Sequence, residues 1–448
     1  MKRQFFLMMI ILHVGTGLFA ETISLEQARV LALANSRSLA QYNMQIRNSI
    51  LDEKNQLYSM LPSLSAGYSV SMDYLNRDWG FVNPIDTLSA GATLSITQTI
   101  FQGGKSFIQK AISAIATESV RKSALAEYFN VLDNLDNAYY AALEAIASLE
   151  AAESSLQTSV LSLSMAEIRL ASGMLNQGDY LRALADKESR ENARNQARRN
   201  LSLRMTQLKS LTGLEETVDL EAIDFSAYEG VIQRLAGISD EEADALYDEF
   251  LRTLITTNPS LARAALSNQR AEKNFSLARR DFSPTISATI FSTGLTYSVA
   301  NGFSTTSSGG ISIRGNIPID YWITANRLEK SRISLDSAAL DYIGAVISLE
   351  TELQSSLINV FAQAESVLSS RRSLEYTEKH FEYVMERYRL SQSSVADLGE
   401  ASSLLITSRN NLIRATYGFL QSISRLRSLE AIDDEERLIS ILLSNPSY

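Results

Sequence analysis

The chain has 448 residues, no cysteine, two histidines and a formal net charge of −10 at pH 7. The lack of cysteine excludes disulfides, thiolate metal sites and a lipidated amino-terminal cysteine. The acidic balance argues against nucleic acid as a partner, because phosphate binding requires a basic face.

The first 20 residues have the pattern of an export signal. Lys2 and Arg3 provide the positive start, residues 5–14 form a short apolar run, and Ala20 fits the last position before cleavage. That run is shorter than the roughly 20 apolar residues of a membrane-spanning helix. No longer apolar run follows, so the sequence predicts an exported chain without membrane helices.

Two pairs of segments alternate between apolar and polar residues. In the first pair, residues 64–74 and 88–101, the even positions are mostly apolar, while Ser, Thr and Gly fill the odd positions up to Ser95, except for Asp73. The second pair covers residues 285–297 and 309–319. A period of two predicts strands with one apolar and one polar face, which suits a sheet between lipid and water. On this pattern alone, two surface hairpins of a soluble protein fit equally well.

The remaining sequence favours very long helices. Residues 105–172 and 325–391 contain no proline, and their apolar residues recur at steps of three and four. Each stretch would extend for roughly 100 Å. Shorter helices are expected after tight turns, at 177–211 and 396–432. The pattern therefore predicts two antiparallel coiled-coil hairpins, at about 105–211 and 325–431.

The chain repeats itself once. Arg169, Gly173, Asp179 and Ala183 are followed, 218 positions later, by Arg387, Ser391, Asp397 and Ala401. We therefore expect a signal (1–20), a first repeat (21–212), an acidic equatorial linker (213–250), a second repeat (251–432) and a carboxyl-terminal tail (433–448). Each repeat is predicted to contain a helix, a β-hairpin and a long coiled-coil hairpin.

Four strands cannot close a sheet inside a membrane. The smallest membrane barrels use about eight strands, and an open edge in lipid leaves backbone groups unpaired at a cost of several kcal/mol each. Several copies would therefore have to share one barrel, and three copies would provide about twelve strands. This reasoning favours a homo-oligomer.

The sequence resembles the TolC-like outer-membrane efflux channels. The resemblance rests on a proline before the first strand of each repeat, in Leu61-Pro62-Ser63-Leu64 and Ser283-Pro284-Thr285-Ile286, and on Ile100-Phe101-Gln102-Gly103-Gly104 before the long helix. It implies a mainly α chain with a transmembrane β part, assembled as a homotrimer. A twelve-stranded β-barrel in outer-membrane lipid would continue as an α-helical barrel in the periplasm.

The resemblance also implies a function and partners. The chain would be the exit duct of a tripartite efflux or type I secretion system, working with a periplasmic adaptor protein and an inner-membrane transporter. No cofactor, metal or nucleic acid is implied. The alternative is a soluble periplasmic coiled-coil structural or adaptor protein, which would be a monomer that needs no detergent.

The resemblance further implies a periplasmic gate at the helical turns, formed by Asp179, Tyr388, Asp397 and Glu400. Adaptor-contacting tips would include Gly173, Met174, Ser391 and Ser393. The simpler interpretation of Asp179 and Asp397 is that they start helices, where acidic side chains are favourable. Both roles can coexist. Ser393 and Ser394 stand where relatives often carry a basic residue, so a particular salt bridge between hairpins is not expected.

Enzymatic chemistry is not predicted. Outside the signal the chain has one histidine, His380, which cannot form a zinc site with cysteines or other histidines. Gly104-Lys105-Ser106 resembles the end of a phosphate loop, but Thr99 occupies the position of the required first glycine.

Overall fold

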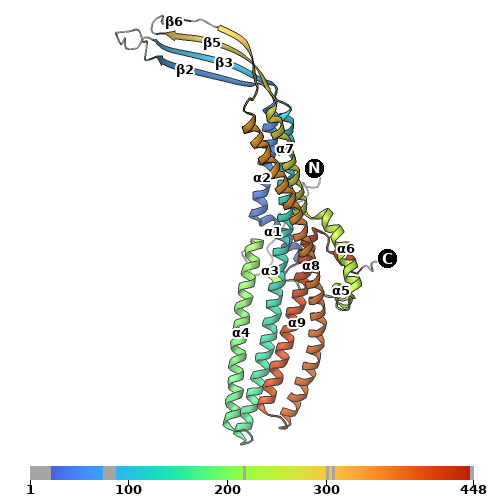
Figure 1. Cartoon of the computed structure of the whole chain (residues 1–448). Helices are drawn as coiled ribbons and strands as arrows, with labels where there is room; N and C mark the ends of the chain where they lie inside the picture. Colours follow the sequence, from blue (N-terminus) through green and yellow to red (C-terminus); the bar gives the residue numbers. More distant parts are fainter. Residues whose placement is uncertain (1–21, 74–86, 215–217, 299–301, 305–307, 444–448) are drawn as a thin grey trace. The chain divides into compact units, whose positions relative to one another are not determined.

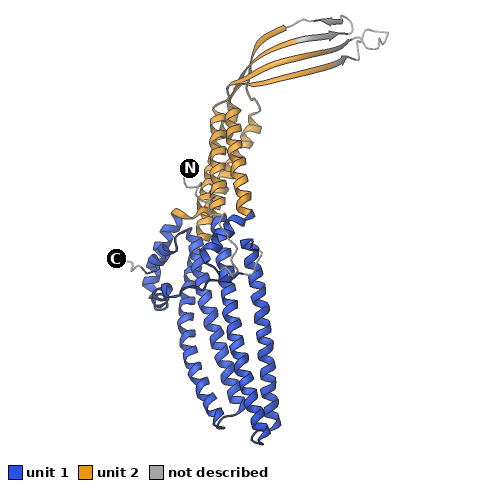
Figure 2. Cartoon of the chain, turned by 180° about the vertical axis from the view of Figure 1, so that it is seen from behind, with its two compact units in different colours: residues 1–37, 127–255, 351–448 blue, residues 38–126, 256–350 orange. Residues whose placement is uncertain are grey.

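The computed structural model describes residues 22–73, 87–214, 218–298, 302–304 and 308–443 (Figure 1). The predicted export signal lies outside these ranges, as do residues 444–448 of the predicted tail. The chain divides into two compact units, one of residues 1–37, 127–255 and 351–448, and one of residues 38–126 and 256–350 (Figure 2). Within the described ranges, none of the helices combines the length and the apolar character needed to cross a membrane.

The smaller unit contains a sheet with strand order β2-β3-β5, in which both β6 and β7 pair with the far side of β5. All pairs are antiparallel. The strands are β2 (Ser63–Asp73), β3 (Thr87–Phe101), β5 (Thr285–Ser298), β6 (Gly302–Ser304) and β7 (Ser308–Asn316). The last strand was expected to reach residue 319. It ends earlier because Pro318 cannot donate a ladder hydrogen bond.

The register places one kind of side chain on each face of this sheet. Leu64, Ile96, Ile290 and Ile311 are successive partners across the four main strands. The neighbouring row on the other face consists of Ser63, Thr97, Thr289 and Ser312. Thr97 Oγ1 lies 3.1 Å from Thr289 Oγ1, which joins the two repeats. One face is therefore mainly apolar, interrupted by Gln98 and Ser292, and the other mainly carries hydroxyl groups, interrupted by Phe291.

The junction between strands and helices depends on a glycine pair. Gly103 and Gly104 have φ values of 66° and 79°, in the left-handed region that favours glycine. A Cβ on Gly103 would lie 2.5 Å from the Cβ of Ser283, in the second repeat. The same junction is held by Arg280, whose Nη1 donates to the carbonyl of Gly103 at 3.1 Å, and by an ion pair of 2.7 Å between Lys105 and Asp281.

The order of elements repeats, as predicted. In the first half, α1 (Leu25–Asn35) and α2 (Arg37–Tyr58) precede the strands, and α3 (Lys105–Ala171) and α4 (Gln177–Thr212) follow them. In the second half the corresponding helices are α6 (Asp240–Thr257), α7 (Pro259–Arg279), α8 (Tyr321–Arg389) and α9 (Val395–Glu430), with a 3-10 turn at Arg280–Phe282 before β5. The predicted fold class, a mainly helical chain with a β part and a duplicated helix–hairpin–coiled-coil order, is confirmed.

The larger unit contains most of both coiled-coil hairpins and four short elements not predicted from sequence. These are α5 (Ser226–Leu235), α10 (Glu435–Leu443) and a parallel pair of β1 (Thr22–Ile23) with β4 (Asp219–Leu220). The fully buried Tyr139 of α3 donates its hydroxyl to the carbonyls of Ile23 and Glu221, at 2.8 and 2.9 Å. The segment after the amino terminus is thereby attached to the segment that links the repeats.

Glu430 provides a pH-dependent test of this core. It is completely buried at the end of α9, and burial raises its pKa from 4.5 to about 8. The folded state then keeps a proton that the unfolded state releases above pH 4.5, so stability falls as the pH rises towards 8. We expect Glu430→Gln, which resembles the protonated acid, to be about 1–3 kcal/mol more stable than the wild type at pH 8.

Below about pH 4 the two proteins should be equally stable, because both side chains are then neutral in the folded and unfolded states. Chemical unfolding curves measured at both pH values make the comparison. A difference that is the same at both pH values would contradict the assignment.

Candidate functional site

The two coiled-coil hairpins have closely matched turns. Residues 172–176 join α3 to α4, and residues 390–394 join α8 to α9. Gly173 and Ser391 occupy the same place in each turn and have φ values of 74° and 61°. In both turns the amide of the next residue donates back into the helix at 2.8 Å, from Met174 to Arg169 and from Gln392 to Arg387. The duplication detected in the sequence therefore extends to backbone conformation.

The returning helices also begin alike. The Asn176 side chain accepts from the amide of Asp179 at 2.8 Å, and Ser394 accepts from the amide of Asp397 at 3.1 Å. The Asp397 carboxylate accepts from the Ser394 amide at 2.9 Å and from the Ser393 hydroxyl at 3.1 Å, and the hydrogen bonds to Ser394 and Ser393 lower its pKa. Both aspartates thus take part in helix caps, as the simpler interpretation of the sequence expected.

Tyr388 lies inside the chain and does not face solvent. Its side chain is completely buried, in an apolar cluster that includes Ala166, Ala183, Val395 and Leu398. The Arg169 guanidinium lies 4.2 Å from the centre of the tyrosine ring and donates to the Tyr388 carbonyl oxygen. Burial is the main cause of the raised pKa of the Tyr388 hydroxyl. This residue therefore packs one hairpin against the other.

The other predicted residues lie on the surface of the turns. Met174 is 74% exposed, and Gly173, Ser391, Asp397 and Glu400 are also exposed. Glu400 borders a cavity of about 470 Å³ between α3, α4 and α9, together with Arg182 and Asp186. The structure thus brings the predicted residues to one end of the hairpins, with Tyr388 buried, Asp179 and Ser393 half-buried, and the others exposed.

The two turns allow a direct comparison of backbone strain. A non-glycine residue in the left-handed region costs about 1–2 kcal/mol, so Ser391→Gly should stabilise the second turn by about 1 kcal/mol. Gly173→Ala should destabilise the first turn by a similar amount, because alanine would have to adopt the left-handed φ of Gly173. No atom lies within 4 Å of the added Cβ, so no overlap adds to this cost. Hydrogen exchange of the amides in each turn measures both effects. Equal protection in wild type and variants would contradict the prediction.

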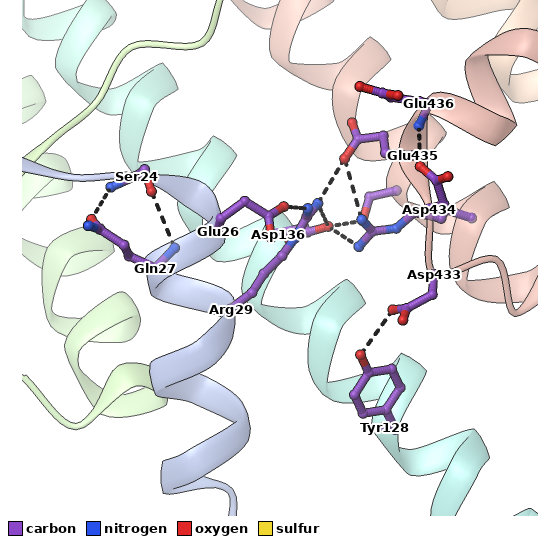
Figure 3. Close-up of polar contacts among 12 residues, drawn as sticks. Ser24, Glu26, Gln27, Arg29, Tyr128, Asp136, Asp433, Asp434, Glu435 and Glu436 are labelled. Atoms are coloured by element: carbon purple, nitrogen blue, oxygen red, sulfur yellow. Dashed lines mark hydrogen bonds and ion pairs between the residues drawn. The ribbon is translucent and has the colours of Figure 1, made fainter. Parts of the chain in front are cut away.

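A second site in the same unit is a buried ion cluster, formed by Arg29, Asp136, Arg427 and Glu435 (Figure 3). Arg29 binds Asp136 at two points, with Nε–Oδ1 and Nη2–Oδ2 distances of 2.8 Å. Arg427 Nη2 reaches the same Oδ2 at 2.6 Å, and Glu435 lies 3.1 Å from Arg29 and 3.4 Å from Arg427. Arg29 also pairs with the exposed Glu26, outside the buried part of the cluster, where two positive and two negative groups balance within a few ångströms.

The cluster joins segments that are far apart in the sequence. Arg29 comes from α1, Asp136 from α3, Arg427 from α9 and Glu435 from α10. The hydroxyl of Ser424 donates to Asp136 at 2.9 Å, and the Tyr228 hydroxyl of α5 donates to Glu435. Burial alone would lower the pKa of Arg29, but the hydrogen bond and charge of Asp136 raise it. Asp136 is completely buried and Arg427 nearly so, so neither charge has water as a substitute partner.

The sequence interpretation missed this cluster. A signal did exist, because Asp136 occupies the apolar face of α3 between Leu132 and Tyr139, where a charge needs a buried partner. The partners could not be identified, since they lie 107 and 291 residues away.

Comparison with known proteins places these features in context. The family model described as outer membrane efflux protein matches residues 28–214 and 250–430. The outer membrane protein TolC of Escherichia coli (strain K12) is 21% identical over 428 residues, which cover 89% of this chain and 81% of TolC.

Solved structures show the same fold. The CmeC outer membrane channel of Campylobacter jejuni has a TM-score of 0.74 at 17% identity, covering 94% of this chain and 89% of its own. The MtrE outer membrane channel of Neisseria gonorrhoeae, solved in an open state, has a TM-score of 0.73 at 16% identity, covering 94% and 93%.

Proposed function

Because the chain belongs to the outer membrane efflux protein family, we propose that it is the exit channel through which a tripartite efflux or type I secretion system releases solutes. The proteins it resembles are channels and not enzymes. The sheet would lie in the outer membrane and the helices would extend into the periplasm. An inner-membrane transporter and a periplasmic adaptor protein would complete the system, with the adaptor contacting the hairpin tips at Gly173, Met174, Ser391 and Ser393.

The observation that carries this proposal is the two-sided sheet. Its apolar row contains Leu64 and Ile311, which are 69% and 73% exposed, while the opposite row is formed by hydroxyl groups. Exposed apolar side chains on a regular sheet face suit contact with lipid, and a hydroxyl face suits a water-filled interior. A soluble coiled-coil adaptor, the alternative from sequence, gives no reason for this separation.

We further propose that three copies share the sheet. In one chain β2 lies at one edge of the sheet and β7 at the other. Unpaired edge groups in lipid cost several kcal/mol each, and pairing the β2 of one copy with the β7 of the next removes that cost. Three copies would close a sheet of about twelve strands.

The positions of three acidic residues support a gate at the ends of the hairpins. Asp179, Asp397 and Glu400 lie near the ends of the hairpins, where threefold symmetry would turn each into a ring of carboxylates that attracts cations. Tyr388 would act from inside the chain, by holding the second hairpin against Arg169 of the first. Opening would then require this contact to separate.

The proposal is tested by conductance across a planar bilayer with the detergent-purified protein, whose oligomeric mass is determined on the same sample. A trimer with stable, cation-preferring conductance steps is expected. A detergent-independent monomer without conductance would overturn the channel proposal and favour the adaptor alternative.

The acidic rings are tested by Asp179→Asn combined with Asp397→Asn. Asparagine keeps the size and much of the capping ability of aspartate but removes the charge. We expect the variant to lose part of its cation preference and its block by multivalent cations, because two rings become neutral. Glu375→Gln, which removes an exposed charge paired with Lys379, is the control. Unchanged ion selectivity in the double variant would refute the gate assignment.

A further inference from the structure

The contacts that join the two hairpins differ in strength between the region near the turns and the region of the ion cluster. Near the turns, the contact consists of Arg169 against Tyr388 and a small apolar cluster. Farther along, the buried ion cluster joins α3 to α9 through Asp136 and Arg427. Asp136 lies about 35 residues from the end of α3, and Arg427 about 32 from the start of α9, so each is roughly 50 Å from its turn.

The hairpins are harder to separate at the ion cluster than near the turns. Pulling α3 from α9 there would leave Asp136, Arg29 and Arg427 buried without full compensation, which is strongly unfavourable. Near the turns, the half-buried Arg169 contacts the Tyr388 ring, which contributes about 0.5–2 kcal/mol, beside one hydrogen bond to the Tyr388 carbonyl and the apolar cluster, and separation there leaves no fully buried charge. Movement of one hairpin relative to the other is therefore easier at the turns than at the cluster.

We infer that the ion cluster of Arg29, Asp136, Arg427 and Glu435 is the fixed joint that sets the separation of the hairpin tips. Its members are positioning residues for the gate and do not contact the solute. A tilt of roughly 5° at the cluster would move a tip by about 4 Å, so a small loosening there is amplified over the length of the helices. The inference rests on the proposed channel function, in which the tips control passage.

Two short helices outside the long hairpins take part in the same joint. Arg29 belongs to α1 and Glu435 to α10, and both bind residues of the long hairpins. Tyr228, which donates to Glu435, adds the segment between the repeats. The inference therefore assigns α1, α5 and α10 a role in setting the distance between hairpins.

The experiment measures the distance between the two turns of one chain. Because the chain has no cysteine, Met174→Cys and Gln392→Cys introduce two specific spin-label sites on exposed positions. Labelled chains are mixed with an excess of unlabelled chains, and pulsed electron paramagnetic resonance gives the distance distribution. It is measured for Arg29→Gln, Arg29→Lys and Glu435→Gln, alongside planar-bilayer conductance of the same samples.

We expect Arg29→Gln to shift the distribution to longer distances and to raise the conductance, with a smaller change for Arg29→Lys, which keeps the charge but loses the two-point bond. Lys379→Gln, which breaks an exposed ion pair with Glu375 within α8, should leave the distribution unchanged. Variants that assemble like the wild type but keep its tip distances would overturn the inference. If Arg29→Gln does not assemble, Arg29→Lys and Glu435→Gln decide by the same criterion.

The two proposals fail in different ways. A wild type without conductance would refute the channel, while the spin-label distances would still decide whether the cluster positions the tips. A conducting wild type whose cluster variants keep both their distances and their conductance would refute only the joint.

Discussion

Asp136→Asn is expected to lower the free energy of unfolding by about 3–5 kcal/mol, the usual cost of breaking a buried ion pair by removing one partner. The substitution leaves Arg29 and Arg427 with Glu435 and the exposed Glu26 as remaining carboxylates, so the buried part of the cluster gains an uncompensated positive charge. It also weakens the hydrogen bonds that Arg29, Arg427 and Ser424 donate to Asp136. Denaturant unfolding of the purified protein, followed by circular dichroism, measures the loss.

Asp133→Asn is the matched control, since Asp133 lies one turn away on the same helix. Its carboxylate is 3.4 Å from Arg425, whose side chain is half exposed. Burial raises the pKa of Asp133, which means that the charged form is disfavoured at this position. Replacement by a neutral amide should therefore cost less than Asp136→Asn, because the charge of Arg425 stays in contact with water. Equal losses for the two variants would show that the ion cluster has no special contribution.

Gly103→Ala is expected to disrupt the strand–helix junction and to reduce strongly the amount of assembled protein in the outer membrane. The new Cβ would approach Ser283 to 2.5 Å, and alanine would also have to adopt a φ of 66°. The conformational cost alone is about 1–2 kcal/mol, and the overlap adds to it because Arg280 donates to the Gly103 carbonyl and so restrains this backbone. Heat-resistant oligomer in isolated outer membranes is the quantity to compare.

Two further variants separate the two causes. Gly104→Ala has the same kind of backbone cost, with a φ of 79°, but its Cβ would meet no atom within 4 Å. It should assemble better than Gly103→Ala. Adding Ser283→Gly to Gly103→Ala removes the overlapping atoms and should restore part of the assembly. If Gly104→Ala were as defective as Gly103→Ala, the close approach to Ser283 would not be the reason for this glycine.

Local patterns in the sequence were sufficient to predict the architecture. The alternation around Leu64 and Leu94 depends only on the period of a strand, and the uninterrupted stretch after Lys105 only on helix-forming residues and the absence of proline. The duplicated turns at Gly173 and Ser391 were found from spacing alone. The division into signal, repeats, linker and tail, and the roles of Asp179, Asp397 and Glu400 in a gate, remain predictions.

The sequence by itself therefore determined the fold class, because it depends on short-range periodicity and on the order of elements, while the family followed from the resemblance carried by the motifs around Pro62, Gly104 and Pro284. Only the tertiary structure decided that Tyr388 is buried under Arg169, that Gly103 meets Ser283, and that Arg29, Asp136, Arg427 and Glu435 form one cluster. Apart from Arg427 and Glu435, these contacts join residues separated by more than a hundred positions, and no local pattern specifies such pairs. They are selected by packing, since a buried charge or a left-handed glycine is stable only where the opposite segment supplies its partner or leaves it room.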